Sequence, residues 1–90
     1  MEGFLYLLES EKNGSHYLGS TVNTETRIAE HNSGITASTK NKGPWKLFAS
    51  WKFDTIEEAR SVEYYIKRMK IKLTKESVDY WMNKYKNKDS

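Results

Sequence analysis

Two short apolar segments near the start of the chain stand either side of an Asn-Gly pair, and this arrangement constrains the fold more than any other feature of the sequence. Asn13-Gly14 favours the two-residue turn of a β-hairpin, because that turn needs positive φ angles at both positions. Residues 3–9 are rich in aliphatic and aromatic side chains, as buried strands are, and residues 16–21 are expected to form the returning strand. The sequence therefore predicts an antiparallel hairpin over residues 3–21.

A third strand is predicted over residues 45–53. Apolar side chains occupy every second position there: Trp45, Leu47, Ala49, Trp51 and Phe53. Polar side chains lie between them, except at Phe48. A period of two residues is typical of a strand with one face on the core and the other in water. We therefore expect the five apolar side chains to share one buried face.

The first helix is predicted between the second and third strands. Asn23 or Thr24 can cap its N-terminus. The helix is expected over residues 24–32, and Asn32-Ser33-Gly34 ends it. Residues 35–44 are polar and have no periodic apolar pattern, so they are expected to form a loop.

Two further helices are predicted after the third strand. Thr55-Ile56-Glu57-Glu58 is a capping-box signature, and the helix that it opens is expected to run to about Met69. Thr74 begins a last helix, and residues 86–90 are expected to fray as a basic tail. The order β-β-α-β-α-α contains no repeat and no linker. It predicts one α+β domain over residues 1–85, in which a small three-stranded antiparallel sheet is flanked by helices.

The composition restricts both the environment and the chemistry. The 90 residues include no cysteine, which excludes disulfides and thiolate metal sites, and a reducing cytosol suits such a chain. No apolar run approaches the roughly 20 residues that span a bilayer, and the N-terminus lacks a signal-peptide pattern. We therefore expect a cytoplasmic monomer without a membrane partner.

The charge is distributed unevenly along the chain. Residues 1–59 carry six basic and eight acidic side chains, whereas residues 60–90 carry nine basic and four acidic ones. The later part would attract a polyanion such as nucleic acid. A solvated, lysine-rich helix surface would give the same pattern, so charge alone does not decide between the two.

Four side chains that precede the third strand in the sequence have the chemistry needed to cleave a phosphodiester. Tyr6 and Tyr17 can face each other across the hairpin, and a phenol can relay a proton if a nearby cation lowers its pKa. Arg27 and His31 share a helix face at i and i+4, where a guanidinium can bind a phosphate and an imidazole can accept a proton. Each has an ordinary alternative, because tyrosines pack in strands and a histidine can simply cap a surface helix.

Glu63 is the most informative of the polar residues. Its neighbours Ala59 and Ile66 belong to the apolar stripe of the predicted helix, and a carboxylate beside a core is costly unless it is paired or binds a cation. One carboxylate together with waters and a substrate phosphate is an ordinary Mg²⁺ arrangement. The alternative is a weak i,i+4 salt bridge to Lys67. The sequence contains no P-loop, GxGxxG or HExxH motif.

Taken together, these residues resemble the GIY-YIG nuclease superfamily over about residues 3–70, in particular its small single-domain branch and the N-terminal nuclease domain of the excision-repair incision subunit. Phe4-Leu5-Tyr6 stands where the family has Gly-Ile-Tyr, and Tyr17-Leu18-Gly19 where it has Tyr-Ile-Gly. The family's arginine corresponds to Arg27, and its tyrosine or histidine four residues later corresponds to His31. The family's metal-binding glutamate corresponds to Glu63.

The resemblance implies hydrolysis of DNA phosphodiesters with one Mg²⁺ or Mn²⁺ held by Glu63. Tyr6 or Tyr17 would help to deprotonate the attacking water, Arg27 would stabilise the charged transition state, and His31 would orient water or assist proton transfer. We expect supporting or nucleic-acid-binding roles for a further set of residues: Gly19, Asn32, Lys40, Lys42, Lys46, Lys67, Arg68 and Lys70.

Two departures from the family pattern stand out. Phe4 replaces the first motif's glycine, which is expected to change packing more than chemistry. Ser20 stands where some relatives carry a lysine, so one possible cation near Tyr17 is missing.

The favoured interpretation is a structure-selective or weakly sequence-specific endonuclease of DNA repair or processing, with DNA, or alternatively RNA, as its partner. Two other functions stay open. The chain could be a non-catalytic module that binds nucleic acid through residues 67–75 and 40–46. It could also be a subunit that docks through an exposed Trp81 and Tyr85 on a protein that supplies specificity.

Overall fold

Three strands and three helices make up the fold. The computed structural model describes residues 1–36 and 39–87, so two residues of the predicted loop lie outside the described residues. In chain order the elements are β1 (Gly3–Ser10), β2 (His16–Thr21), α1 (Thr24–Ser33), β3 (Trp45–Phe53), α2 (Ile56–Arg68) and α3 (Lys75–Asn87). The predicted α+β class and the order β-β-α-β-α-α are confirmed. No helix in the described part of the chain is long and apolar enough to cross a membrane.

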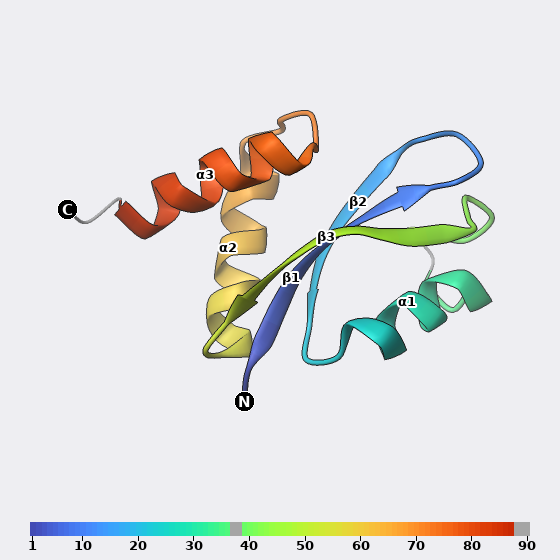
Figure 1. Cartoon of the computed structure of the whole chain (residues 1–90), viewed down its shortest axis with the longest axis horizontal. Coiled ribbons are helices and arrows are strands. Elements are labelled where there is room, and N and C mark those ends of the chain that lie inside the picture. Colours follow the sequence, from blue (N-terminus) through green and yellow to red (C-terminus); the bar gives the residue numbers. More distant parts are fainter. Residues whose placement is uncertain (37–38, 88–90) are drawn as a thin grey trace.

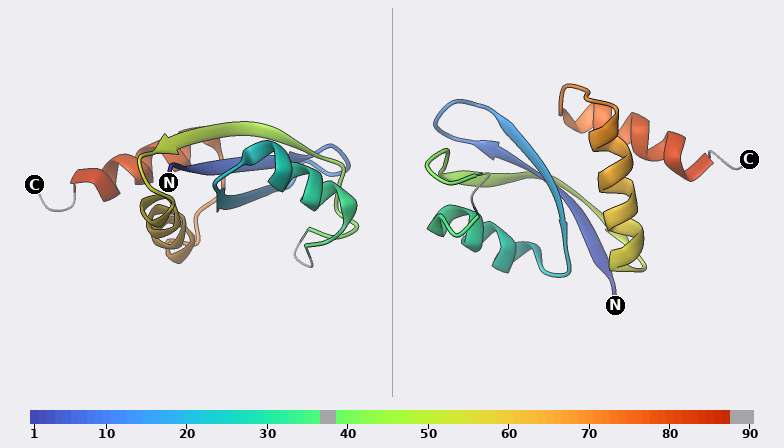
Figure 2. Two further views of the ribbon diagram at one scale, coloured as in Figure 1. Left: turned by 90° about the horizontal axis from the view of Figure 1, so that it is seen from below. Right: turned by 180° about the vertical axis from the view of Figure 1, so that it is seen from behind.

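The strands form one antiparallel sheet in the order β2-β1-β3, so β1 is central and β2 and β3 are its edges. The sheet is strongly twisted. α1 lies on one side of it, and α2 and α3 lie together on the other (Figure 1). Figure 2 shows the same separation from behind. Residues 5–8 of β1 are at most 1% exposed, because helices cover both faces of this central strand.

Two groups of buried side chains lie on the two faces. The large cluster joins the sheet to α2 and α3 and contains Leu5, Leu7, Leu18, Phe53, Ile56, Ala59, Val62, Ile66, Val78 and Met82. The small cluster lies on the α1 side and contains Tyr6, Leu8 and Trp45, against which Tyr17 and Ile28 pack. Alternate residues of β1 therefore feed two separate cores, and one of them contains a tyrosine of the predicted site.

The third strand departs from the predicted alternation. Successive residues of β1 pair with Ala49 and Leu47, so Phe48 is an extra residue in β3. A bulge of this kind reverses the faces on which the flanking residues lie. Trp45 therefore belongs to the small cluster, whereas Trp51 packs against the large one. Leu47 is 43% exposed, and the expectation that all five apolar side chains share one buried face is wrong.

Side-chain hydrogen bonds explain where the first two helices begin. The backbone N–H of Thr26 donates to Asn23 Oδ1, and the backbone N–H of Glu58 donates to Thr55 Oγ1, each at 3.1 Å. α1 ends at Gly34, whose φ of 82° is a left-handed angle that favours glycine. Asn23, Thr55 and Gly34 thus act as the sequence predicts.

The last helix differs in two respects from expectation. α3 continues to Asn87, two residues into the segment 86–90 that was expected to fray, and the rest of that segment lies outside the described residues. Trp81 and Tyr85 are partly buried against the large cluster and do not form the exposed docking face that the sequence suggested. The amphipathic face of α3 is covered because it packs on α2.

Candidate active site

Tyr6 and Gly19 lie directly opposite each other in the β1–β2 ladder. A Cβ built on Gly19 would lie 2.5 Å from Tyr6 Cζ and would also collide with the phenol oxygen. The glycine of the second motif therefore leaves the space that the tyrosine of the first motif occupies. This contact gives a physical reason for the two residue types at this spacing.

The Tyr6 hydroxyl leads into a buried chain of hydrogen bonds. Tyr6 Oη lies 2.9 Å from His31 Nε2, and His31 Nδ1 lies 2.7 Å from Thr39 Oγ1. All three residues are at most 2% exposed. Trp45 Nε1–H donates to the Thr39 carbonyl at 3.2 Å, which fixes the loop that carries Thr39. His31 is therefore held at both ring nitrogens.

Tyr17 forms an aromatic wall beside this chain. Its ring packs edge-to-face against His31, with 4.9 Å between centroids, and lies 6.4 Å from the Tyr6 centroid. Lys67 Nζ lies 5.2 Å from the Tyr17 centroid. Some relatives carry a lysine at the position of Ser20; here Lys67 of α2 places a positive charge near Tyr17 instead.

Arg27 approaches the same group from α1. Its guanidinium is hydrogen-bonded to Tyr6 and donates to Glu30 Oε1 at 2.9 Å. Its side chain is 32% exposed, so donors of the guanidinium can reach a phosphate at the surface. Arg27 and His31 lie on one face of α1, in line with their i,i+4 spacing.

Glu63 comes to the site from the other side of the sheet. Ser20 Oγ–H donates to Glu63 Oε1 and Lys67 Nζ–H donates to Oε2, each at 2.5 Å. The same Lys67 ammonium covers Tyr17. Because β2 is an edge strand, α2 can bring Glu63 around it toward the phenols. Glu63 and Tyr6 are near enough for the carboxylate charge to raise the pKa of Tyr6 slightly.

Burial sets the protonation of the two central groups. It raises the pKa of Tyr6 to about 12, and the hydrogen bond from Arg27 opposes this shift. Burial also lowers the pKa of His31, and the positive charge of Arg27 adds to the effect. Hydrogen bonds to Glu30 and to Tyr6 raise the pKa of Arg27. At neutral pH the site therefore holds a neutral phenol, a neutral imidazole and a permanent positive charge.

The structure thus brings six predicted residues together around β2, with Lys67 beside them: Tyr6, Tyr17, Gly19, Arg27, His31 and Glu63. Asn32 has a different place. Its Nδ2–H donates to the Trp45 carbonyl at 3.0 Å, and its Oδ1 accepts from the Trp45 N–H at 2.6 Å. Asn32 therefore ties α1 to the start of β3 and supports the site indirectly.

The other predicted basic residues lie on two separate surfaces. Lys40 lines a polar pocket of about 530 Å³ that also includes His31 and Thr39, and Lys42 is exposed on the same loop. Lys46 is ion-paired with a β1 carboxylate at 3.4 Å. Arg68 and Lys70 lie at and just beyond the C-terminal end of α2.

Thr39 is the clearest member of the site that sequence reasoning missed. It lies in a polar loop without periodic pattern, so nothing in its neighbourhood marked it. The signal is indirect and needs the burial of His31 to be known: a buried imidazole requires a hydrogen-bond partner for each ring nitrogen. In the sequence Ser20 stands out only as an uncharged residue, whereas in the structure its hydroxyl orients Glu63.

The donor set fits a divalent cation that has few protein ligands. Within the described residues, no group of three His, Cys, Asp or Glu side chains could hold a metal ion. Glu63 supplies the carboxylate that lies beside the tyrosines. One of its oxygens already binds a positive charge, the Lys67 ammonium. Mg²⁺ is commonly bound by one or two carboxylates, waters and a substrate phosphate. The residues therefore suit Mg²⁺ or Mn²⁺.

A comparison of the sequence with models of protein families identifies the family to which the chain belongs. A family model described as the GIY-YIG catalytic domain matches residues 2–77. The chain belongs to the GIY-YIG family. The resemblance inferred from the two tripeptides and the three later residues is confirmed, and the fold is that of a nuclease family.

Other GIY-YIG relatives are similar over most of their length. The chain is 36% identical over 88 residues to the UPF0213 protein BH0048 of Halalkalibacterium halodurans, covering 97% of this chain and 93% of that protein. It is 43% identical over 67 residues to the UPF0213 protein CPE1444 of Clostridium perfringens, covering 73% of this chain and 71% of that protein. The solution NMR structure of the UPF0213 protein BH0048 from Bacillus halodurans has 33% sequence identity and a TM-score of 0.47, over 92% of this chain and 84% of that chain.

Proposed function

We propose that this protein is a metal-dependent endonuclease that hydrolyses DNA phosphodiester bonds, structure-selectively or with weak sequence specificity, in DNA repair or processing. The observation that carries the proposal is that Arg27, the hydrogen-bonded Tyr6–His31 pair and Glu63 lie around β2, where Arg27 and Glu63 both influence the pKa of Tyr6. This arrangement offers a cation site, a proton relay and a phosphate-binding cation around one point. Membership of the GIY-YIG family supports nuclease chemistry.

Glu63 would hold the metal ion in place of the Lys67 ammonium. A bound Mg²⁺ or Mn²⁺ supplies Lewis-acid stabilisation of the charge that develops on the phosphoryl oxygens, worth several kcal/mol. Ser20 Oγ–H keeps one carboxylate oxygen oriented. Lys67 lies beside Tyr17, and once displaced from Glu63 its ammonium would be free to bind a phosphate oxygen.

Tyr6 and His31 would move the proton of the attacking water. The phenol is not deprotonated beforehand, because its pKa is about 12. It can pass its own proton to His31 Nε2, 2.9 Å away, while its oxygen accepts the proton of the water. The lowered pKa of His31 keeps Nε2 free to accept, and Nδ1–H donates to Thr39 Oγ1 in this tautomer. General acid–base help of this kind contributes roughly 10²–10⁴-fold.

Arg27 would bind the scissile phosphate. A guanidinium presents a planar fork of donors that matches phosphate oxygens, and Glu30 holds this one in position at 2.9 Å. Removing a donor that stabilises transition-state charge costs roughly 10²–10³-fold in rate. Tyr17 would act as the wall that keeps the His31 ring in place.

The test is a nicking assay on supercoiled plasmid, branched DNA and duplex DNA with Mg²⁺ or Mn²⁺. We expect Glu63→Gln and Tyr6→Phe to reduce the rate at least about 100-fold. Glu57→Gln on the same helix and Tyr80→Phe on α3 are matched controls that should keep the wild-type rate. Nicking by Glu63→Gln at the wild-type rate would contradict the proposal, as would a wild-type protein that nicks none of these substrates.

A second candidate function is binding of nucleic acid without cleavage. The Lys67–Glu63 contact favours it, because the ammonium neutralises the carboxylate that a metal ion would need. Such a module would bind duplex DNA with an affinity that falls with salt, at a log–log slope of about −0.9 per phosphate contact. Binding without nicking in any divalent metal would support this function over the first.

A further inference from the structure

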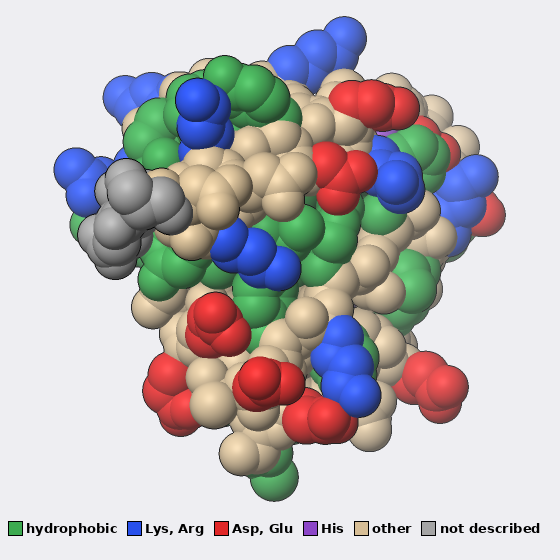
Figure 3. All heavy atoms as spheres, turned by 60° about the vertical axis from the view of Figure 1, so that its left-hand side comes forward, with side chains coloured by type: hydrophobic (Ala, Val, Ile, Leu, Met, Phe, Trp, Pro, Cys, Tyr) green, Lys and Arg blue, Asp and Glu red, His purple; other side chains and the backbone are tan. Residues whose placement is uncertain are grey.

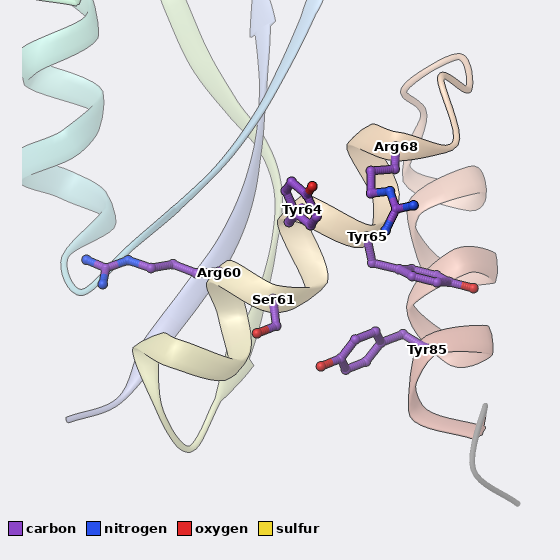
Figure 4. A pocket seen from close by; sticks show the side chains of 6 residues that line it. All are labelled: Arg60, Ser61, Tyr64, Tyr65, Arg68 and Tyr85. Atoms are coloured by element: carbon purple, nitrogen blue, oxygen red, sulfur yellow. The ribbon is translucent and has the colours of Figure 1, made fainter.

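The outer face of α2 carries basic and aromatic side chains that the proposed chemistry does not use. Arg60, Tyr64 and Arg68 follow one another at four-residue spacing and so form a row along the helix, here called the α2 row. Together with Ser61, Tyr65 and Tyr85 they line a pocket of about 420 Å³ between α2 and α3 (Figure 4). Figure 3 shows Lys and Arg side chains set among hydrophobic ones on the neighbouring face, with Asp and Glu side chains also on that face.

The α2 row is continuous with the active site. On a helix of 3.6 residues per turn, Glu63 and Lys67 lie on the side next to Arg60, so the surface runs from the carboxylate onto the row. Figure 4 shows Arg60 extending away from α3, whereas Tyr65 reaches toward it. From Arg60 to Arg68 the helix rises about 12 Å, which is comparable with three or four stacked nucleotides at roughly 3.4 Å each.

The charge of the α2 row suits a polyanion. No carboxylate lines the pocket. Across the part of the chain that the structure describes, neither Arg60 nor Arg68 has an acidic partner within 4.0 Å, whereas several other cations are ion-paired. A phosphate chain can therefore bind these two guanidinium groups without displacing an acidic side chain.

The aromatic part of the row suits a base. Tyr64 is 67% exposed, and the Arg68 guanidinium lies 5.6 Å from its ring centroid. Tyr65 and Tyr85 pack edge-to-face at 5.4 Å and form a firm wall of the pocket. An exposed ring with a cation beside it is the combination on which unpaired bases stack in proteins that bind single strands.

We propose that the α2 row binds a single-stranded segment of nucleic acid leaving the active site, with a base stacked on Tyr64 and phosphates bound by Arg60 and Arg68. The proposal rests on the proposed nuclease function for where this segment starts, but the binding itself needs neither metal nor cleavage. A duplex keeps its bases stacked inside and offers Tyr64 only backbone. The substrate class is therefore DNA with an unpaired segment next to the scissile bond, such as a flap or a fork.

Fluorescence anisotropy with a short labelled oligothymidylate in EDTA tests the binding without cleavage. Tyr64→Ala should weaken binding roughly 5- to 150-fold, the range for the loss of one base–aromatic stack. Tyr64→Phe should bind as the wild type does. Arg60→Gln and Arg68→Gln should each reduce the slope of log affinity against log salt by roughly 0.7. These two variants carry the test if Tyr64→Ala fails to fold by circular dichroism.

Tyr80 and Lys84 on α3 provide a matched control. Lys84 Nζ lies 5.5 Å from the Tyr80 ring centroid, and Tyr80 is 54% exposed, so the pair resembles Tyr64 and Arg68 in chemistry and exposure. Tyr80→Ala should leave binding unchanged. Equal losses in Tyr64→Ala and Tyr80→Ala, or no loss in Tyr64→Ala, would overturn the proposal. Competition by polyglutamate as strong as that by oligothymidylate would also overturn it and would indicate an acidic peptide as the partner.

The two proposals can fail independently. A protein that binds the oligonucleotide through Tyr64 but nicks no DNA would keep this proposal and refute the nuclease function. A protein that nicks DNA while Tyr64→Ala binds single strands and cuts flapped substrates like the wild type would keep the nuclease function and refute this proposal.

Discussion

Gly19 decides whether Tyr6 can point into the site, because the two residues share one place in the β1–β2 ladder. Alanine at this position would put a methyl carbon 2.5 Å from Tyr6 Cζ. We expect Gly19→Ala to lose about 1–3 kcal/mol of stability through overpacking. It should also lose most of the proposed nuclease activity, because the phenol is pushed away from His31. Urea unfolding and nicking rates measure the two effects.

Gly14→Ala is the matched control for this prediction. Gly14 has a φ of 74° and no neighbouring atom within 4 Å of a built Cβ, so alanine there is strained but meets nothing. It should lower stability and leave the nicking rate per folded molecule unchanged. Full activity in Gly19→Ala would show that the Tyr6–Gly19 contact does not matter for the site.

Thr39 acts on the proposed reaction only through His31. Thr39→Val leaves Nδ1 of His31 buried without its partner, which should cost about 1–3 kcal/mol of stability. The nicking rate should fall roughly tenfold or more, because the ring is no longer held in the accepting tautomer. Thr39→Ser keeps the hydroxyl and should restore both quantities.

Thr36→Val controls for the loss of a hydroxyl from the same loop. Among the described residues, Thr36 Oγ1 is buried and has no hydrogen-bond partner, so its removal should cost nothing. The ¹⁵N chemical shifts of His31 report its tautomer directly. An unaltered tautomer and rate in Thr39→Val would refute the positioning role.

His31 should make the stability of the protein depend on pH. Burial lowers the pKa of His31, so between that lowered value and about 6.5 the unfolded chain binds a proton that the folded chain does not. Stability therefore rises with pH across this window and is lost as pH falls, by at most about 1.4 kcal/mol per pH unit for one proton. Nicking should fall in the same direction, because a protonated His31 cannot accept from Tyr6.

Urea unfolding of wild type and of His31→Gln between pH 5 and 8 measures this contribution. The variant should lack the part of the pH dependence that His31 causes. Identical slopes of stability against pH in the two proteins would mean that His31 titrates alike in the folded and unfolded chains.

At the scale of secondary structure, Asn32 stands in for a neighbouring strand at the free edge of β3. Its side-chain amide forms hydrogen bonds with both the backbone N–H and the carbonyl of Trp45. Asn32→Ala should cost about 1–3 kcal/mol, since both groups lose their partner and α1 is released from β3. Ser33→Ala, which removes only a hydroxyl bonded to the Glu30 carbonyl, is the control. Denaturant unfolding compares them, and equal stability of the two variants would argue against this role of Asn32.

Elements fixed by neighbours in the chain were predictable from the sequence. The hairpin between β1 and β2 and the caps at Asn23 and Thr55 depend on a few adjacent residues, and the structure has them where the pattern indicated. The hairpin connection is longer than the expected two-residue turn, and Gly14 has a positive φ whereas Asn13 does not. The bulge at Phe48 was not predictable, because an extra apolar residue fits a bulge or an exposed side chain equally well. Pairing with β1, which is distant in sequence, decides between the two.

The same distinction applies to the site. Motif spacing pointed to Tyr6, Arg27, His31 and Glu63 because each occupies a recognisable position in a strand or helix. The partners of His31 and Glu63, namely Thr39 and Ser20, follow from how a loop and a helix dock on the sheet. No short stretch of sequence indicates how this loop and this helix dock on the sheet.

At the scale of the whole molecule, a bound metal ion should stabilise the fold, because only the folded chain places Glu63 beside Ser20 and the tyrosines. At a Mg²⁺ concentration ten times Kd, the gain is about 1.4 kcal/mol, or roughly 5–10 °C in Tm for a domain of this size. Scanning fluorimetry against NaCl of equal ionic strength measures the shift. Glu63→Gln should abolish it and Glu57→Gln should keep it, and a shift of equal size in Glu63→Gln would place the ion elsewhere.

β2 is the outermost strand on its side of the sheet, and in the described part of the chain no other strand pairs with its free edge. The side chains of the candidate site therefore approach this free edge, or rim, of the sheet from both of its faces. A long polymer can be laid sideways against such a rim at any point along its length. No free end has to be threaded, so a closed circle is as accessible as a linear molecule.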